Sequence, residues 1–166
     1  MKRIIVFLVM MVSMMPTAWS QGVDLGVFTH EEGSQVTIST DGIKADNPAT
    51  VMSIFLDSCA VNGNYKILCD PQIEQTQLQN AVEVFNKYAG SYFLAFPDDD
   101  AEKQELYAQL KGTSISLPEN HYLFKAIKLD RNDRSYPIKD FGAFGVVSHD
   151  TTNNTYWIAE FGIGNQ

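Results

Sequence analysis

Cys59 and Cys69 are the two cysteines of this chain, and the turn-forming segment Asn62-Gly63-Asn64 lies between them. Their spacing is not the Cys-x-x-Cys of a redox site, and no second pair is present to complete a zinc site. The three histidines are scattered along the sequence and do not have the spacing of metal ligands. Two thiols in an oxidising compartment usually form a disulfide. The role of this pair therefore depends on where the protein resides.

Residues 1–20 have the three-part pattern of a secretory signal peptide. Lys2 and Arg3 give a positive start, an apolar run follows, and small residues at Ala18 and Ser20 predict cleavage after Ser20. The apolar run is too short to span a bilayer, which takes about 20 apolar residues. We therefore expect a periplasmic or secreted protein that is not inserted in the membrane after the signal is removed.

The predicted export favours a structural disulfide between Cys59 and Cys69. Asn47-Pro48 is typical of a helix start and Gly63 of a helix end, so Cys59 is expected in the last turn of a helix. The apolar sequence YKILC (65–69) predicts a short strand that ends at Cys69. A bridge would tie this helix to the strand, and closing a loop of this size contributes about 2.5 to 3 kcal/mol.

The remaining patterns predict a single α+β domain over residues 21–166. Apolar or alternating runs predict a hairpin within 23–40 and a buried strand at 91–96. Helical periodicity predicts a second helix from Asp70-Pro71 to about Ala89, and residues 101–112 predict a short solvated helix. The glycine-containing runs near the end predict a β-meander. We expect a mostly antiparallel sheet with two main helices packed on one face.

The charge of the chain restricts its partners. The formal net charge is −8, and cleavage of the basic leader would make the remaining chain more acidic. Lys and Arg are sparse and unclustered, so the sequence predicts neither nucleic-acid binding nor attachment to an anionic bilayer. An acidic surface favours a cationic partner, and it also keeps an exported protein soluble. We expect the partner to be another protein that is basic or associated with the cell envelope.

No motif in the sequence predicts catalysis, a cofactor or a metal site. The Gly-x-Ser-x-Gly elbow, the His-Glu-x-x-His motif and the phosphate loop are all missing from the sequence. His149 and Asp150 could form an acid–base pair, but no nucleophile can be assigned to them. The acidic groups at 98–102 and 130–133 lack the spacing of a calcium loop. We therefore expect no enzymatic activity, no cofactor and no metal.

Five residues are candidates for a protein-binding surface. Asp98, Asp99 and Asp100 are consecutive carboxylates that precede the third predicted helix, where stabilisation by the helix dipole would also explain them. Tyr136 and Trp157 are aromatic residues of the kind that anchors protein interfaces. On a predicted strand, Trp157 and the tyrosine before it should point to opposite faces of the sheet.

Residues 39–71 and 76–96 are similar to the small N-terminal domains of secretins and of signal-transducing outer-membrane receptors. Those domains have a helix, a short strand that ends in Asp-Pro, a Leu-x-x-Ala helix, a glycine and a strand. The matching positions in this chain are Asp70-Pro71, Leu78, Ala81 and Gly90. The resemblance implies a protein-docking module of the cell envelope.

Two functional hypotheses follow from the sequence. In the first, the chain is a small exported protein that binds another protein, as an inhibitor or immunity factor against a cationic cell-wall-targeting enzyme. In the second, it is a docking module or accessory subunit of an envelope secretion or pilus machine. A soluble, salt-sensitive basic partner would support the first hypothesis, and a membrane-embedded assembly would support the second.

Overall fold

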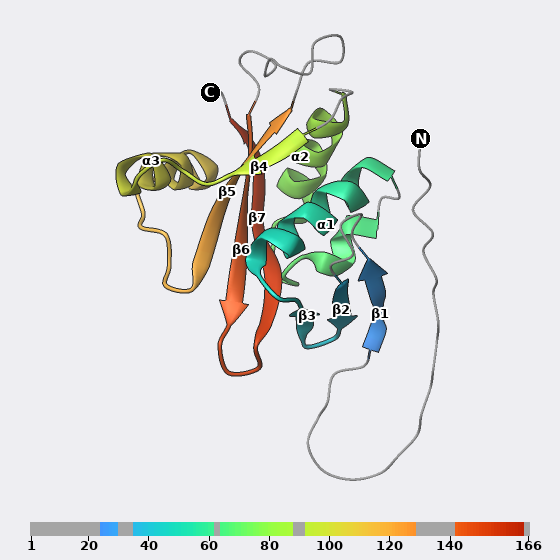
Figure 1. Ribbon diagram of the computed structural model, residues 1–166. Helices are drawn as coiled ribbons and strands as arrows, with labels where there is room; N and C mark the ends of the chain where they lie inside the picture. The colour runs from blue at the N-terminus through green and yellow to red at the C-terminus, as the bar shows by residue number, and fades with distance from the viewer. Residues whose placement is uncertain (1–23, 30–34, 62–63, 88–91, 129–141, 165–166) are drawn as a thin grey trace.

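A computed structural model of the chain describes residues 24–29, 35–61, 64–87, 92–128 and 142–164. The predicted signal peptide at 1–20 lies outside these residues. Among the helices that are described, none is long and apolar enough to cross a membrane. Figure 1 shows the elements, which in chain order are β1 (Asp24–Thr29), β2 (Gln35–Ser39), β3 (Gly42–Lys44), α1 (Pro48–Val61), the 3-10 helix η1 (Asn64–Leu68), α2 (Gln75–Lys87), β4 (Tyr92–Ala95), α3 (Asp100–Lys111), β5 (His121–Lys128), β6 (Gly142–Asp150) and β7 (Thr155–Gly164).

The strands form one seven-stranded sheet in the order β1-β2-β3-β7-β6-β5-β4. All neighbouring strands are antiparallel. An N-terminal meander (β1–β3) and a C-terminal meander (β5–β7) meet where Ile43 pairs with Tyr156, the single register pair between β3 and β7. The predicted α+β class, the antiparallel sheet and the C-terminal meander are therefore confirmed.

Helices α1 and α2 cover one face of the sheet and form the main core with it. As predicted, α1 begins at an Asn47 cap, whose side-chain oxygen accepts the Thr50 N–H at 2.9 Å. Phe55 of α1 is fully buried and meets Phe161 of β7 edge to face, with ring centroids 5.0 Å apart. Phe85 of α2 contacts the same Phe161 ring at 5.9 Å. Phe161 thus joins both helices to the sheet, and edge-to-face pairs of this kind add to simple burial.

Helix α3 packs on the opposite face of the sheet (Figure 1), which corrects the prediction of a solvated helix. Its residues Leu106 and Tyr107 are buried in a second cluster with Phe144 and Val146 of β6. Successive residues of β6 alternate between this cluster and the main core, which contains Val147. The central strand is therefore covered on both sides, and the fold has three layers.

The predicted Cys59–Cys69 disulfide is not present in the structure, where both thiols are free and buried. Residues 64–68 form the 3-10 helix η1 and not the predicted strand. As a result, the Cys69 thiol donates a hydrogen bond to the Tyr65 carbonyl oxygen at 3.3 Å. Cys69 also forms an isolated parallel bridge with Ile158 of β7. The backbone conformation of this segment thus gives Cys69 a different partner from the one expected.

Both thiols are held in the protonated form. Burial, with a smaller contribution from the charge of Asp70, raises the pKa of Cys69 to about 12. Burial also raises the pKa of Cys59 well above its usual range, with a smaller contribution from the nearby Cys69. Because the thiolate is the reactive form of cysteine, these side chains are chemically inert while the protein is folded.

We expect neither thiol to react with iodoacetamide in the folded protein at mildly alkaline pH. In denaturant without reductant, both thiols should be alkylated, because unfolding restores their ordinary pKa and their exposure. Mass spectrometry counts the added groups in each case. Protein that gains label in denaturant only after a reductant is added would contain the disulfide, and this result would contradict the free thiols of the structure.

Candidate functional site

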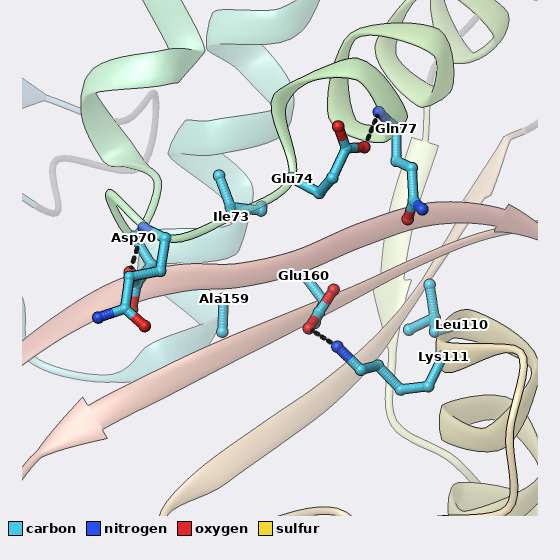
Figure 2. Close-up of a pocket in the computed structure, with 9 residues that line it drawn as sticks. Asp70, Ile73, Glu74, Gln77, Leu110, Lys111, Ala159 and Glu160 are labelled. Carbon is cyan, nitrogen blue, oxygen red and sulfur yellow. Dashed lines mark hydrogen bonds and ion pairs between the residues drawn. The ribbon is translucent and has the colours of Figure 1, made fainter.

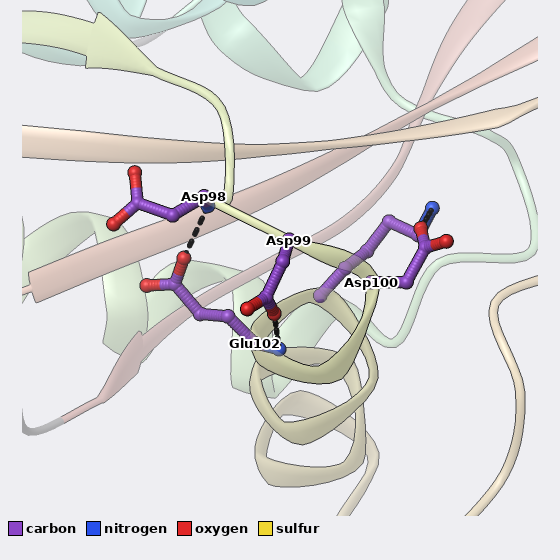
Figure 3. A network of polar contacts seen from close by, with 5 residues as sticks. Asp98, Asp99, Asp100 and Glu102 are labelled. Atoms are coloured by element: carbon purple, nitrogen blue, oxygen red, sulfur yellow. Dashed lines mark hydrogen bonds and ion pairs between the residues drawn. The ribbon is translucent and has the colours of Figure 1, made fainter.

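The three consecutive aspartates, predicted to be a binding surface, lie at the start of α3, where Asp99 is the N-cap (Figure 3). The Asp99 carboxylate accepts the Glu102 N–H at 2.8 Å. The Glu102 carboxylate accepts the Asp98 N–H in return, and it also pairs with Lys125 of β5 at 2.9 Å. Asp100 forms an ion pair within the first turn. The Asp98 carboxylate differs from those of Asp99 and Asp100, because it has no hydrogen-bond or ion-pair partner among the described residues.

These contacts make the α3 cap sensitive to acid. The hydrogen bond from Lys103 lowers the pKa of Asp100, and the hydrogen bond from Lys125 lowers the pKa of Glu102. A carboxyl whose pKa is lower in the folded state stabilises the protein above its unfolded pKa. This stabilisation is lost as the pH falls through the folded pKa, so the cap weakens in acid.

Of the two aromatic candidates, Tyr136 lies outside the described residues and Trp157 lies on β7. Trp157 is partly exposed, whereas Tyr156 is buried and stacks on His149 with ring centroids 4.4 Å apart. The two neighbours therefore point to opposite faces of the sheet, as predicted. Among the described residues, Trp157 makes no hydrogen bond or ring contact with Asp98, Asp99 or Asp100, so these candidates do not form one site.

His149 and Asp150 are held by the turn between β6 and β7 and do not bond to each other. The His149 Nε2 atom lies 3.0 Å from the Asn154 side-chain oxygen. The Asp150 carboxylate accepts the backbone N–H groups of Thr152 and Asn153, and a hydrogen bond from the Asn153 side chain is the main cause of its lowered pKa. Both side chains thus support the hairpin that the sequence predicted here.

A cleft lies at the C-terminal end of α3, beside Leu110 and Lys111 (Figure 2). It has a volume of about 410 Å³, within the range of about 300–1,000 Å³ that is usual for ligand sites. The segment before α2, the last turn of α3 and the middle of β7 surround it. The residues that line it are Asp70, Gln72, Ile73, Glu74, Gln77, Leu110, Lys111, Ala159 and Glu160.

A β-bulge in β7 shapes one wall of this cleft. The partners of Val146 and Val147 in β6 are Glu160 and Ile158, so Ala159 is an extra residue in the register. A bulge re-aims the side chains around it, and here both Ala159 and Glu160 line the cleft. Next to the bulge, the Asp70 N–H donates a hydrogen bond to the Ile158 carbonyl oxygen of β7 at 2.8 Å. This bond fixes the segment before α2 beside the bulge.

The lining of the cleft carries three carboxylates and one ammonium group. Glu160 pairs with Lys111, and this contact raises the pKa of Lys111. The Glu74 carboxylate caps α2 by accepting two backbone N–H groups, which lower its pKa. Asp70 accepts the Gln72 N–H at 2.7 Å. Because Lys111 balances only one of the three acids, the cleft is negatively charged.

The chemistry of this lining fits an organic cation better than a metal ion. No group of three or more His, Cys, Asp and Glu side chains is placed to hold a metal within the part of the chain that the structure describes. Each carboxylate still has acceptor capacity, because an ionised carboxylate has about four acceptor positions. A lysine or arginine side chain could therefore enter the cleft and bond to one of these acids.

Sequence reasoning missed this cleft because its residues come from separate segments. Asp70 and Glu74 precede α2, Lys111 ends α3, and Glu160 lies on β7. One local signal was available, since Glu160 is the sole charged residue in the strand sequence TYWIAEFGIG. A charge at the centre of such an apolar run indicates a local break in the burial of the strand.

No family model matches the sequence, and no match to it was found among curated proteins or solved structures.

Proposed function

We propose that this chain is a small exported protein that binds a cationic protein, and that its acidic cleft receives a basic side chain of that partner. The observation that carries this proposal is the lining of the cleft, with three carboxylates against a single lysine. Hydrogen bonds between ionised partners are about twice as strong as neutral ones. The formal net charge of −8 would also steer a cationic partner toward the protein.

The specific form of the proposal is an inhibitor or immunity factor against a cationic cell-wall-targeting enzyme. The predicted leader would bring the chain to the compartment where such enzymes act. Complementary charge across an interface favours the correct partner and raises the association rate. The segment before α2 is fixed by the bond from the Asp70 N–H to the Ile158 carbonyl oxygen, and the other walls belong to helices and a central strand, so little ordering is needed on binding.

The docking-module hypothesis receives no support from the geometry. The similarity to secretin N-terminal domains depends on a short strand between two helices. In this chain the corresponding residues, 64–68, form the 3-10 helix η1. We therefore retain the binding of a soluble basic protein as the preferred function.

The double variant Asp70→Asn/Glu160→Gln should weaken binding to a basic peptidoglycan-cleaving enzyme by at least about tenfold, because each charged hydrogen bond contributes about 1.5–3 kcal/mol. Titration calorimetry at low and at physiological salt measures the affinity, and the inhibition of cell-wall hydrolysis measures the function. Wild-type binding should weaken as salt is added, because salt screens exposed charges.

The matched control is Glu83→Gln/Glu105→Gln, which removes the same charge from exposed positions of α2 and α3 outside the cleft. This control should bind within about twofold of the wild type, since exposed charges contribute little individually. An equal loss in both double variants would show that only net charge matters. That result, or a wild-type protein that binds no basic enzyme, would contradict the proposal.

A further inference from the structure

We propose that the outer edge of β4 is a second docking surface, which takes up an extended, basic segment of a partner protein as an added strand. β4 is the last strand of the sheet, and within the described residues it pairs with β5 alone. A strand edge presents backbone N–H and C=O groups that are ready to pair with another chain. Addition of a strand to such an edge is a recurrent mode of peptide recognition.

An exposed aromatic side chain lies at the end of this edge. Phe96 directly follows β4 and is 61% exposed, more than any other large apolar side chain that the structure describes. Its ring rests on Phe124 of β5, with centroids 5.0 Å apart. One side of the ring is thus supported by the core, while the rest remains open to a partner. Such a supported aromatic residue can anchor an interface at a low cost in side-chain entropy.

The strand itself is held firmly in position. The Tyr92 hydroxyl lies 3.1 Å from the Ser53 carbonyl oxygen and 2.5 Å from the Asp57 carboxylate, and both acceptors belong to α1. On its inner side, the whole of β4 is in register with residues of β5. A rigid edge of this kind needs no rearrangement before it pairs with an added strand.

The negative charge beside this edge favours a basic segment as the added strand. Asp98, Asp99 and Asp100 follow Phe96 after Pro97, and all three are exposed. Asp99 and Asp100 are used within α3, but the Asp98 carboxylate has no partner among the described residues. A second copy of the chain would bring the same net charge of −8 and be repelled. A basic segment would be attracted, and its pairing would end at Pro97, which has no N–H to offer.

The experiment uses short synthetic peptides and the full chain. A peptide of alternating lysine and valine should bind and slow the hydrogen exchange of β4 amides. A matched lysine–valine peptide that carries a methyl group on every backbone nitrogen has the same charge but no N–H on either side, so it cannot add as a strand. It should bind at least about tenfold more weakly. Equal binding of the two peptides, or a lack of protection at β4, would overturn the proposal.

Variants separate this surface from the cleft. Phe96→Ser should weaken the lysine–valine peptide about tenfold, whereas Ile115→Ser, at another exposed apolar residue, should leave its affinity unchanged. The cleft variant Asp70→Asn/Glu160→Gln should leave the protection of the β4 amides by this peptide unchanged, so failure of this proposal can be distinguished from failure of the proposed function. Wild-type affinity in Phe96→Ser would overturn it. A concentration-dependent dimer that Phe96→Ser abolishes would overturn it in favour of a second copy.

Discussion

Phe55→Ala is expected to lower the free energy of unfolding by about 3–5 kcal/mol, the usual range for removing a buried phenylalanine. Phe55 is fully buried between α1 and the sheet. Its ring contacts Tyr65 of η1 at 6.1 Å and Phe161 of β7 at 5.0 Å, both edge to face. The substitution would therefore leave a cavity where three elements meet. Stabilities of small domains are about 5–15 kcal/mol in total, so a loss of this size would leave little of the folded state.

Denaturant unfolding followed by circular dichroism measures this change. Ile67→Ala in η1 is a suitable control, because Ile67 is 41% exposed and sits in the same region of the fold. The control should change the free energy of unfolding by less than about 1 kcal/mol. If Phe55→Ala changed it by as little as the control, the packing of α1 against η1 and β7 described above would be wrong.

Gly42→Ala should lower the free energy of unfolding by about 3 kcal/mol, from a strained backbone conformation and a steric clash together. Gly42 has a φ of +126°, which side chains other than glycine rarely adopt. A Cβ at this position would lie 2.7 Å from the Thr155 Cβ atom. Thr155 cannot easily move, because it is buried and its hydroxyl donates to the Asp41 carbonyl oxygen at 3.0 Å.

Gly112→Ala is the matched control for this prediction. Gly112 also has a positive φ, +65°, at the C-terminal end of α3, but nothing lies within 4 Å of an added Cβ. This control should cost about 1 kcal/mol, the price of a left-handed conformation without a clash. Thermal unfolding of both variants gives the comparison. Equal costs for the two substitutions would show that the contact between Gly42 and Thr155 is not tight.

Gly42 matters for the whole sheet because of where it lies. The next residue, Ile43, forms the register pair with Tyr156 that joins the two meanders. Strain at Gly42 would therefore act on the junction between β3 and β7. We expect the Gly42→Ala variant to lose hydrogen-exchange protection first in β2 and β3, which reach the rest of the sheet through this junction.

Local patterns predicted some elements well and others badly, and α2 and η1 show the difference. The helical spacing of Leu78, Ala81, Val82 and Phe85 predicted one buried face, and all four are buried in α2. The run YKILC is too short for its period to distinguish a strand from a helix. In the structure, its tyrosine and leucine are buried and its lysine and isoleucine are exposed. Burial of two residues that are three positions apart fits the three residues per turn of the 3-10 helix η1.

The sequence by itself determined the α+β class, the cap at Asn47 and the buried face of α2. These features depend on residues within a few positions of one another, so local periodicity and capping chemistry specify them. Only the tertiary structure decided that α3 covers the second face of the sheet, that Cys69 forms a bridge with Ile158 of β7, and that a bulge in β7 places Glu160 in the same cleft as Asp70 and Lys111. Those outcomes depend on strand register and on packing between distant segments, for which neighbouring residues carry no signal.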